Sequence, residues 1–152
     1  MTHPVPGDAT PELSLPDTHG TPVSLSGLRG MPVAVVFFPF AFSGLCRSEM
    51  RDLQDALEDF EAAGVRLLAV SCDPVPALRA WSELEGFGFD LLSDFWPHGA
   101  AARAFGVFHE ENGHSARGSF LVDEDGMVRW SLLSPSGQGR DIGAYRAALD
   151  AL

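Results

Sequence analysis

The chain has 152 residues, of which 45% are hydrophobic and 20% are charged, a balance typical of a globular domain. Its 21 acidic and 10 basic residues give a net charge of −11, which argues against nucleic-acid and anionic-membrane partners, since both require basic surface. No segment approaches the roughly 20 apolar residues of a transmembrane helix, and residues 1–4 do not begin a signal peptide. These features predict a single cytoplasmic domain over residues 1–152.

The N-terminal half of the chain predicts strands that alternate with helices. In chain order we expect a hairpin formed by residues 12–15 and 23–25, a turn at 28–30, a buried strand over 33–38, a helix from about 44 to 63 and a strand over 65–70. The hairpin turns at Asp17-Thr18-His19-Gly20. Gly64 is a plausible stop for the helix, whose apolar residues follow a mostly three- and four-residue spacing: Leu45, Met50, Leu53, Leu57 and Phe60.

The C-terminal half predicts shorter helices and a second hairpin. In chain order we expect a helix over 76–85, a short strand over 91–94, a helix over 97–105, an irregular segment over 107–117, strands over 119–122 and 127–133, a loop over 134–140 and a helix over 142–152. Asp141 is a candidate cap for the last helix. The inward-facing helical residues are predicted to be Leu78, Trp81, Leu84, Tyr145, Leu149 and Leu152. This order predicts an α/β protein with a mixed central sheet flanked by helices.

Cys46 is the main candidate for a reactive residue. It lies in the first turn of the helix that follows the buried strand 33–38, where unpaired backbone N–H groups and the helix dipole favour negative charge. A thiol in this position is biased toward the thiolate, which is the nucleophilic form. Because a free thiol is only a few per cent ionised at neutral pH, we also expect a cationic neighbour.

The residues around Cys46 resemble a known motif. Pro39, Ser43 and Cys46 have the spacing Pro-x-x-x-Ser/Thr-x-x-Cys, which is the active-site motif of the peroxiredoxins. Residues 117–123, Arg-Gly-Ser-Phe-Leu-Val-Asp, are similar to the segment Arg-x-Thr/Ser-Phe-apolar-apolar-Asp of that family. The order of the predicted elements also resembles the thioredoxin-like fold of peroxiredoxins, with its N-terminal hairpin.

Two further segments narrow this resemblance. Residues 91–99, Leu-Leu-Ser-Asp-Phe-Trp-Pro-His-Gly, and residues 105–108, Phe-Gly-Val-Phe, resemble the alkyl hydroperoxide reductase E branch of actinobacterial one-cysteine peroxiredoxins. Family resolving cysteines usually lie five residues after the first, where Arg51 stands here, or in a C-terminal extension that this sequence lacks. The resemblance therefore implies a one-cysteine enzyme.

The resemblance implies a role for each motif residue. Cys46 would attack the peroxide, and Arg117 would reach the thiolate and the peroxide. Ser43 would hydrogen-bond to both, and Pro39 would shield the thiol from water. The alternative for Arg117 is a surface arginine at a strand start. Ser43 is also a candidate helix cap and Pro39 a strand terminator, and both of these structural roles are compatible with the functional ones. Glu49 is either a supporting residue that pairs with active-site arginines, as in the family, or an exposed helical glutamate.

Other candidates have weaker patterns. Cys72 follows a predicted strand and is expected to pack as a small hydrophobic residue, the alternative being a resolving thiol. Arg47 would point away from Cys46 and is expected at the surface, and the five histidines show no metal-like pairing. Phe40 and Phe42 are candidates for the pocket mouth or a dimer face. The resemblance implies no metal, flavin or other cofactor.

The expected activity is that of a thiol-dependent peroxidase. Its substrates would be hydrogen peroxide and organic hydroperoxides, with peroxynitrite as a further candidate. The Cys46 sulfenic acid would be reduced by an external thiol, either mycothiol with mycoredoxin or a thioredoxin-like system. Association into a homodimer or a larger homo-oligomer is also expected. Two other functions use the same sequence features: a redox sensor or relay that passes Cys46 oxidation to a partner protein, and a non-catalytic scaffold.

Overall fold

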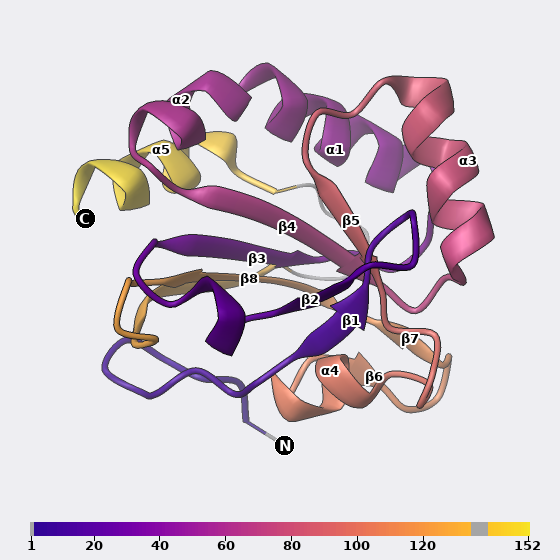
Figure 1. Cartoon of the computed structure of the whole chain (residues 1–152), viewed down its shortest axis with the longest axis horizontal. Coiled ribbons are helices and arrows are strands. Elements are labelled where there is room, and N and C mark those ends of the chain that lie inside the picture. Colours follow the sequence, from indigo (N-terminus) through magenta and orange to yellow (C-terminus); the bar gives the residue numbers. More distant parts are fainter. Residues whose placement is uncertain (1, 135–139) are drawn as a thin grey trace.

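A five-stranded mixed sheet forms the centre of the computed structural model, which describes residues 2–134 and 140–152 (Figure 1). The strand order is β5-β4-β3-β8-β9; β3, β4 and β5 are parallel, whereas β8 is antiparallel to both β3 and β9. The strands are β3 (Val33–Phe37), β4 (Arg66–Ser71), β5 (Asp90–Ser93), β8 (Arg117–Val122) and β9 (Val128–Ser134). The predicted mixed α/β sheet is therefore confirmed.

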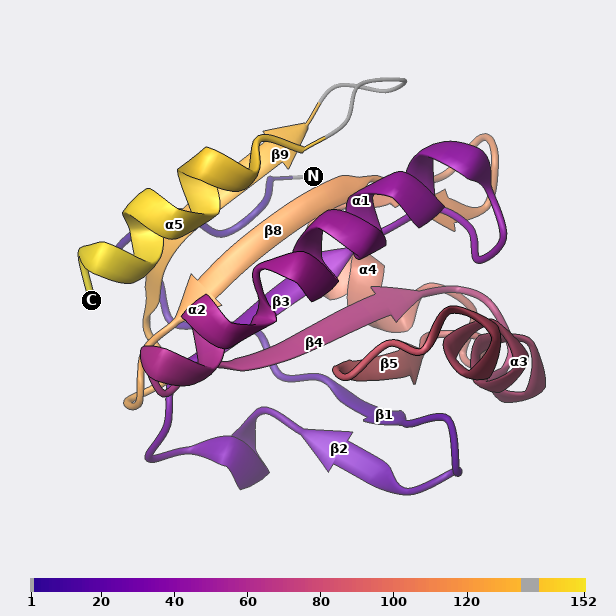
Figure 2. The ribbon, with the colours of Figure 1, turned by 90° about the horizontal axis from the view of Figure 1, so that it is seen from above.

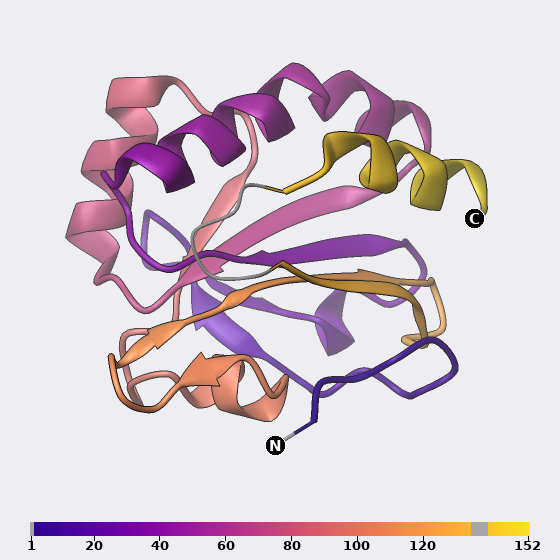
Figure 3. The same ribbon diagram turned by 180° about the vertical axis from the view of Figure 1, so that it is seen from behind.

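Helices cover both faces of this sheet (Figures 2 and 3). One face carries α1 (Gly44–Asp55), α2 (Leu57–Ala62), α3 (Val75–Glu85) and α5 (Ile142–Asp150). The other face carries α4 (Ala100–Ala104) and the hairpin of β1 (Ser14–Pro16) and β2 (Pro22–Ser24), followed by the short 3-10 helix η1 (Ser26–Leu28). A second small hairpin, formed by β6 (Phe108–His109) and β7 (His114–Ser115), precedes β8.

The central strand β3 shows why the sheet is covered on both faces. Its side chains alternate between two separate hydrophobic clusters, with Ala34 and Val36 in the first and Val33, Val35 and Phe37 in the second. All five are buried. An unbroken apolar run is the expected sequence for a strand that has no solvent-facing side.

The predicted helix over 44–63 is in fact two helices. The chain leaves the helical conformation at Ala56, which has φ −93° and ψ 1°, and α2 begins at the next residue. No glycine or proline marks this break in the sequence. The predicted helix over 97–105 is shortened to α4, because Gly99 takes a left-handed conformation with φ 75° immediately before the first helical residue.

Two of the predicted inward-facing residues are wrong. Leu84 is 74% exposed because it lies off the face of α3 that buries Leu78 and Trp81, and Leu152 is 47% exposed because it lies beyond the end of α5. The segment 107–117, predicted to be a loop or an irregular strand, contains the short β6–β7 hairpin. The predicted loop over 134–140 lies mostly outside the described residues; its first residue ends β9. Among the described helices, none combines the length and apolar character that crossing a bilayer requires.

Candidate active site

The first turn of α1 places the Cys46 thiol beyond the carboxyl end of β3. Ser43, the N-cap residue, has an extended backbone, and its Oγ accepts a hydrogen bond from the Cys46 N–H at 3.3 Å. The preceding Phe42 has a φ of 67°, a left-handed conformation that is unusual for a residue other than glycine. Cys46 is 0% exposed. The predicted helix-start position of this thiol is confirmed, and Ser43 caps the helix.

Arg117 contacts the same thiol from β8. Because β8 runs antiparallel to β3 and Ser119 pairs with Val36, the first residue of β8 lies beside the carboxyl end of β3. Both Nη atoms of the buried Arg117 lie 3.6 Å from the Cys46 Sγ and donate to it. The alternative of a surface arginine is wrong. Two donors at equal distance suit a guanidinium to stabilising a charge on this sulfur.

Glu49 connects Arg117 to a second arginine. Its Oε1 accepts a hydrogen bond from Arg117 Nη1 at 3.0 Å, and its Oε2 forms an ion pair with Arg140 Nε at 3.1 Å. Glu49 is 3% exposed, so the alternative of an exposed helical glutamate is wrong. Burial raises the pKa of the Glu49 carboxyl, and the charges of Arg140 and Arg117 oppose that rise. Two guanidinium charges against one carboxylate leave this group with an excess of positive charge beside the thiol.

Arg140 was not a candidate in the sequence. Its side chain is 3% exposed, and its Nη1 donates to Ser119 Oγ at 2.7 Å, while its Nη2 donates to the Phe37 carbonyl oxygen. The Ser119 hydroxyl in turn shares a hydrogen bond with the Tyr145 hydroxyl of α5. Arg140 falls in a predicted loop, and the only sequence signal near it is the following helix cap. Arg140 and Glu49 are 91 residues apart in the sequence, so their contact is formed only by the tertiary fold.

Arg47 and Pro39 make no contact with the Cys46 sulfur among the described hydrogen bonds and ion pairs. Arg47 has an exposed side chain that forms an ion pair with Glu85 of α3, so the expected surface position is confirmed. Pro39 is half-buried in the loop between β3 and α1. A residue that follows β4 also anchors this loop: Asp73 Oδ2 accepts a hydrogen bond from the Ala41 N–H at 2.8 Å.

Cys72 has a different environment from Cys46. It is buried directly after β4, and both cysteines are free. Burial, with smaller contributions from the Asp94 and Asp73 carboxylates, raises the pKa of Cys72 to about 12. A thiol in that environment stays protonated at neutral pH, which agrees with the predicted packing role.

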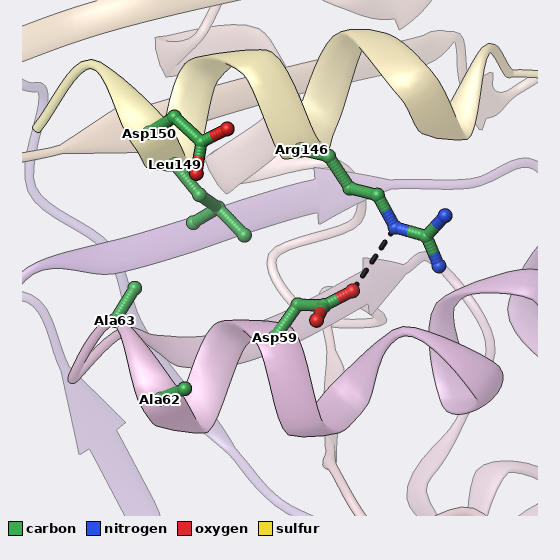
Figure 4. Close-up of a pocket in the computed structure, with 6 residues that line it drawn as sticks. All are labelled: Asp59, Ala62, Ala63, Arg146, Leu149 and Asp150. Carbon is green, nitrogen blue, oxygen red and sulfur yellow. Dashed lines mark hydrogen bonds and ion pairs between the residues drawn. The ribbon is translucent and has the colours of Figure 1, made fainter.

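A groove of about 650 Å³ lies elsewhere on the molecule, between α2 and α5 (Figure 4). Across it, Arg146 Nε donates to Asp59 Oδ2 at 3.0 Å. Ala62, Ala63, Leu149 and Asp150 complete its lining. None of these residues belongs to the predicted site, so the groove is separate from the chemistry around Cys46.

The fold and the site are those of a thiol-dependent peroxidase. The sheet is thioredoxin-like, the thiol is buried at a helix start, and an arginine guanidinium donates to its sulfur through two nitrogen atoms. The model of the AhpC/TSA family matches residues 6–131, and the chain belongs to this peroxiredoxin family. It is a peroxiredoxin, an enzyme with thiol-dependent peroxidase activity.

Known proteins narrow this assignment. The chain is 43% identical over 147 residues to alkyl hydroperoxide reductase E of Mycobacterium tuberculosis, covering 96% of each chain. Among solved structures, it is similar to the peroxidoxin BcpB of M. tuberculosis, with a TM-score of 0.88, 31% identity and 99% of each chain covered. The AhpC of Enterococcus faecalis gives a TM-score of 0.88 at 26% identity, covering 97% of this chain and 92% of that one. The family and the thioredoxin-like fold expected from the sequence are confirmed.

Proposed function

We propose that the chain is a single-domain, one-cysteine peroxidase that reduces hydrogen peroxide and organic hydroperoxides, and also peroxynitrite, through Cys46. The observation that carries this proposal is the position of the Arg117 guanidinium. Both of its Nη atoms lie 3.6 Å from the Cys46 sulfur at the start of α1. Because the peroxide reacts at this sulfur, the two Arg117 donors are also close to the leaving oxygen, on which negative charge develops. The name of the relative, an alkyl hydroperoxide reductase, supports alkyl hydroperoxides as one substrate class.

The proposed step is attack by the Cys46 thiolate on the terminal oxygen of the peroxide. An S–O bond forms as the O–O bond breaks, so the sulfur is oxidised by two electrons and the peroxide is reduced. The terminal oxygen keeps its proton and becomes part of a sulfenic acid. The other oxygen departs as hydroxide or alkoxide and takes a proton from solvent, giving water or an alcohol. With peroxynitrous acid, it departs as part of nitrite. In this step Arg117 stabilises charge on both the thiolate and the leaving oxygen, Ser43 fixes the helix start, and Pro39 excludes water.

Glu49 and Arg140 complete the charge arrangement. Glu49 orients Arg117 through a hydrogen bond at 3.0 Å, but its negative charge alone would cancel the positive charge of that arginine. Arg140, paired with the other carboxylate oxygen, offsets Glu49 and leaves the charge of Arg117 available to the sulfur. Glu49 is therefore a supporting residue whose effect depends on the second arginine.

The sulfenic acid must be reduced by a thiol from another molecule. The sequence holds two cysteines, and burial raises the pKa of the second, Cys72, to about 12, which makes it a poor attacking group. Mycothiol with mycoredoxin, or a thioredoxin-like protein, is the proposed reductant. A cytoplasmic location follows the same reasoning, because such reductants keep free cysteines reduced there. No metal or cofactor takes part in the proposed chemistry.

Stopped-flow oxidation of the reduced protein by several peroxides, with and without each candidate thiol reductant, tests this function. We expect rapid second-order oxidation by at least one peroxide and multiple turnovers with an external thiol. Slow oxidation by every peroxide would contradict the proposal. Oxidation without turnover, together with partner disulfides trapped through Cys46, would instead assign the chain as a redox sensor or relay.

We also propose that the chain forms a homodimer through the exposed aromatic surface near the site. Phe40 and Phe42 are 47% and 54% exposed, and the Phe40 ring contacts His114 at 4.9 Å between centroids. His114 follows Gly113, whose carbonyl oxygen accepts a hydrogen bond from the exposed His98. Exposed aromatic side chains of this kind are typical of protein interfaces.

Sedimentation velocity at micromolar concentration measures this association. We expect a dimer at least, and weaker association in Phe40→Glu, because the charge would be buried at the interface. Leu152→Glu is the matched control, since Leu152 is also 47% exposed but lies at the end of α5. A monomer in both redox states would contradict the proposal.

A further inference from the structure

The polar contacts behind Glu49 extend into the C-terminal helix and end at the Tyr145 hydroxyl, which the proposed chemistry does not use. We propose that Tyr145 is a positioning residue for peroxide reduction: through Ser119, it holds Arg140 in the orientation that pairs with Glu49. This inference rests on the proposed function, because it assigns Tyr145 an effect on the charge beside Cys46. Tyr145 does not touch the reacting atoms. It acts through its contacts with Ser119 and, beyond it, Arg140 and Glu49.

The Tyr145 ring lies in an apolar cluster, and its hydroxyl meets Ser119. The ring is buried between Trp130 of β9, at 5.1 Å between centroids, and Phe60 of α2, at 6.3 Å in an edge arrangement. The Tyr145 hydroxyl shares a hydrogen bond with Ser119 Oγ. A tyrosine in an apolar cluster needs such a partner, because an unpaired buried hydroxyl is unfavourable.

Ser119 links this hydroxyl to the arginine. It lies two residues after Arg117 in β8, so the two side chains share one face of the strand. Its Oγ must accept from Arg140 Nη1, at 2.7 Å, because a guanidinium offers only donors. The second hydrogen bond of the Ser119 hydroxyl, to Tyr145, fixes the direction in which its remaining lone pair points. The serine is thereby a preset acceptor for Arg140.

The orientation of Arg140 matters because its guanidinium has several partners at once. Its Nη1 binds Ser119, its Nη2 binds the Phe37 carbonyl oxygen, and its Nε faces Glu49 Oε2 at 3.1 Å. Loss of the serine contact leaves Nη1 only the longer hydrogen bond to the Gly118 carbonyl oxygen, at 3.4 Å, and allows the guanidinium to turn away from the carboxylate. Glu49 would then act more strongly on Arg117, and less positive charge would reach the Cys46 sulfur.

Tyr145→Phe tests the proposal, since it removes the hydroxyl and keeps the ring. We expect the second-order rate constant for Cys46 oxidation to fall about fivefold near neutral pH, the size of one lost hydrogen bond. The rising part of the rate–pH profile should also move to higher pH, and thiolate absorbance in a Cys72→Ser background should move with it. Ser119→Ala should show the same changes, and the double variant should be no slower than either single one.

Trp130→Phe is the matched control, because it alters packing on the Tyr145 ring and leaves every hydroxyl in place. It should keep the wild-type pH profile, with folding of all variants followed by circular dichroism. An unchanged rate and profile in either Tyr145→Phe or Ser119→Ala would overturn the proposal. Additive losses in the double variant, or an equal shift in Trp130→Phe, would also overturn it, since both outcomes indicate a general packing effect.

Arg140→Ala separates this inference from the proposed function. If it oxidises slowly while Tyr145→Phe oxidises at the wild-type rate, only the role of Tyr145 is wrong. If Arg140→Ala itself oxidises at the wild-type rate, the charge arrangement proposed around Glu49 is wrong, and the inference fails with it. A slow Arg140→Ala variant in which Tyr145→Phe has no additional effect supports both.

Discussion

Cys46→Ser is expected to abolish peroxide reduction, with the oxidation rate constant falling by about 10³-fold or more. A serine hydroxyl in the same place remains protonated at neutral pH and cannot form a sulfenic acid, so the variant loses both the nucleophile and the product. Its helix cap, which uses the Cys46 backbone N–H and Ser43 Oγ, does not depend on the sulfur. The variant should therefore fold, and stopped-flow oxidation by hydrogen peroxide measures the loss.

Cys72→Ser is the matched control for this experiment. Burial raises the pKa of Cys72 to about 12, so its thiol is protonated throughout the working pH range and contributes no nucleophile. The first oxidation step should remain close to the wild-type rate constant. Comparable losses in the two variants, with both folded by circular dichroism, would show that the reactive cysteine has been assigned wrongly.

Arg117→Ala should slow oxidation for two reasons that pH can separate. Removing the guanidinium removes the charge that favours the Cys46 thiolate, and it also removes two donors at 3.6 Å from the sulfur that are placed to act on the departing oxygen. The first effect disappears at a pH where the variant thiol is fully ionised. We expect a deficit on the order of 100-fold to remain there, because a positioned donor contributes about that much.

Arg117→Lys should give an intermediate rate, since it restores a positive charge without the forked pair of donors. The oxidation rate constant measured across pH for the wild type and both variants distinguishes the possibilities. Full recovery of Arg117→Ala at high pH would limit Arg117 to an electrostatic effect on the thiolate. An Arg117→Ala variant as fast as the wild type at every pH would rule out both roles. The structure then points to Arg140 and not to Arg47, which pairs with Glu85 at the surface.

Local sequence patterns predicted most of the fold because they depend on short-range physics. The apolar run at 33–38 required a strand covered on both sides, and the mixed sheet of the structure supplies that cover. The break of the long helix at Ala56 was not predicted, because the residues on both sides favour a helix and no proline or glycine interrupts them. The exposed Leu84 has a different cause: the inward face of α3 runs from Trp81 to the side chain of Glu85, which is 6% exposed, and Leu84 lies outside that face.

The candidate site also combines contacts that local sequence predicts with contacts that depend on the tertiary fold. Ser43 and Cys46 are three residues apart, so their relationship is local: one caps the helix whose first turn holds the other. Arg117 could be connected to them only by its resemblance to a family segment. Its contact with the sulfur arises because β8 pairs antiparallel with β3 and thereby begins where β3 ends.

Local sequence patterns were enough to place a cysteine at the start of a helix after a buried strand, and the motifs around it resemble those of the peroxiredoxins. The charge around that cysteine depends on contacts between distant parts of the chain. Whether Glu49 is buried or exposed depends on which elements pack over α1, and Arg140 reaches it from beyond β9. A buried carboxylate requires opposite charges close to it, and no rule of sequence spacing specifies which distant arginine supplies them.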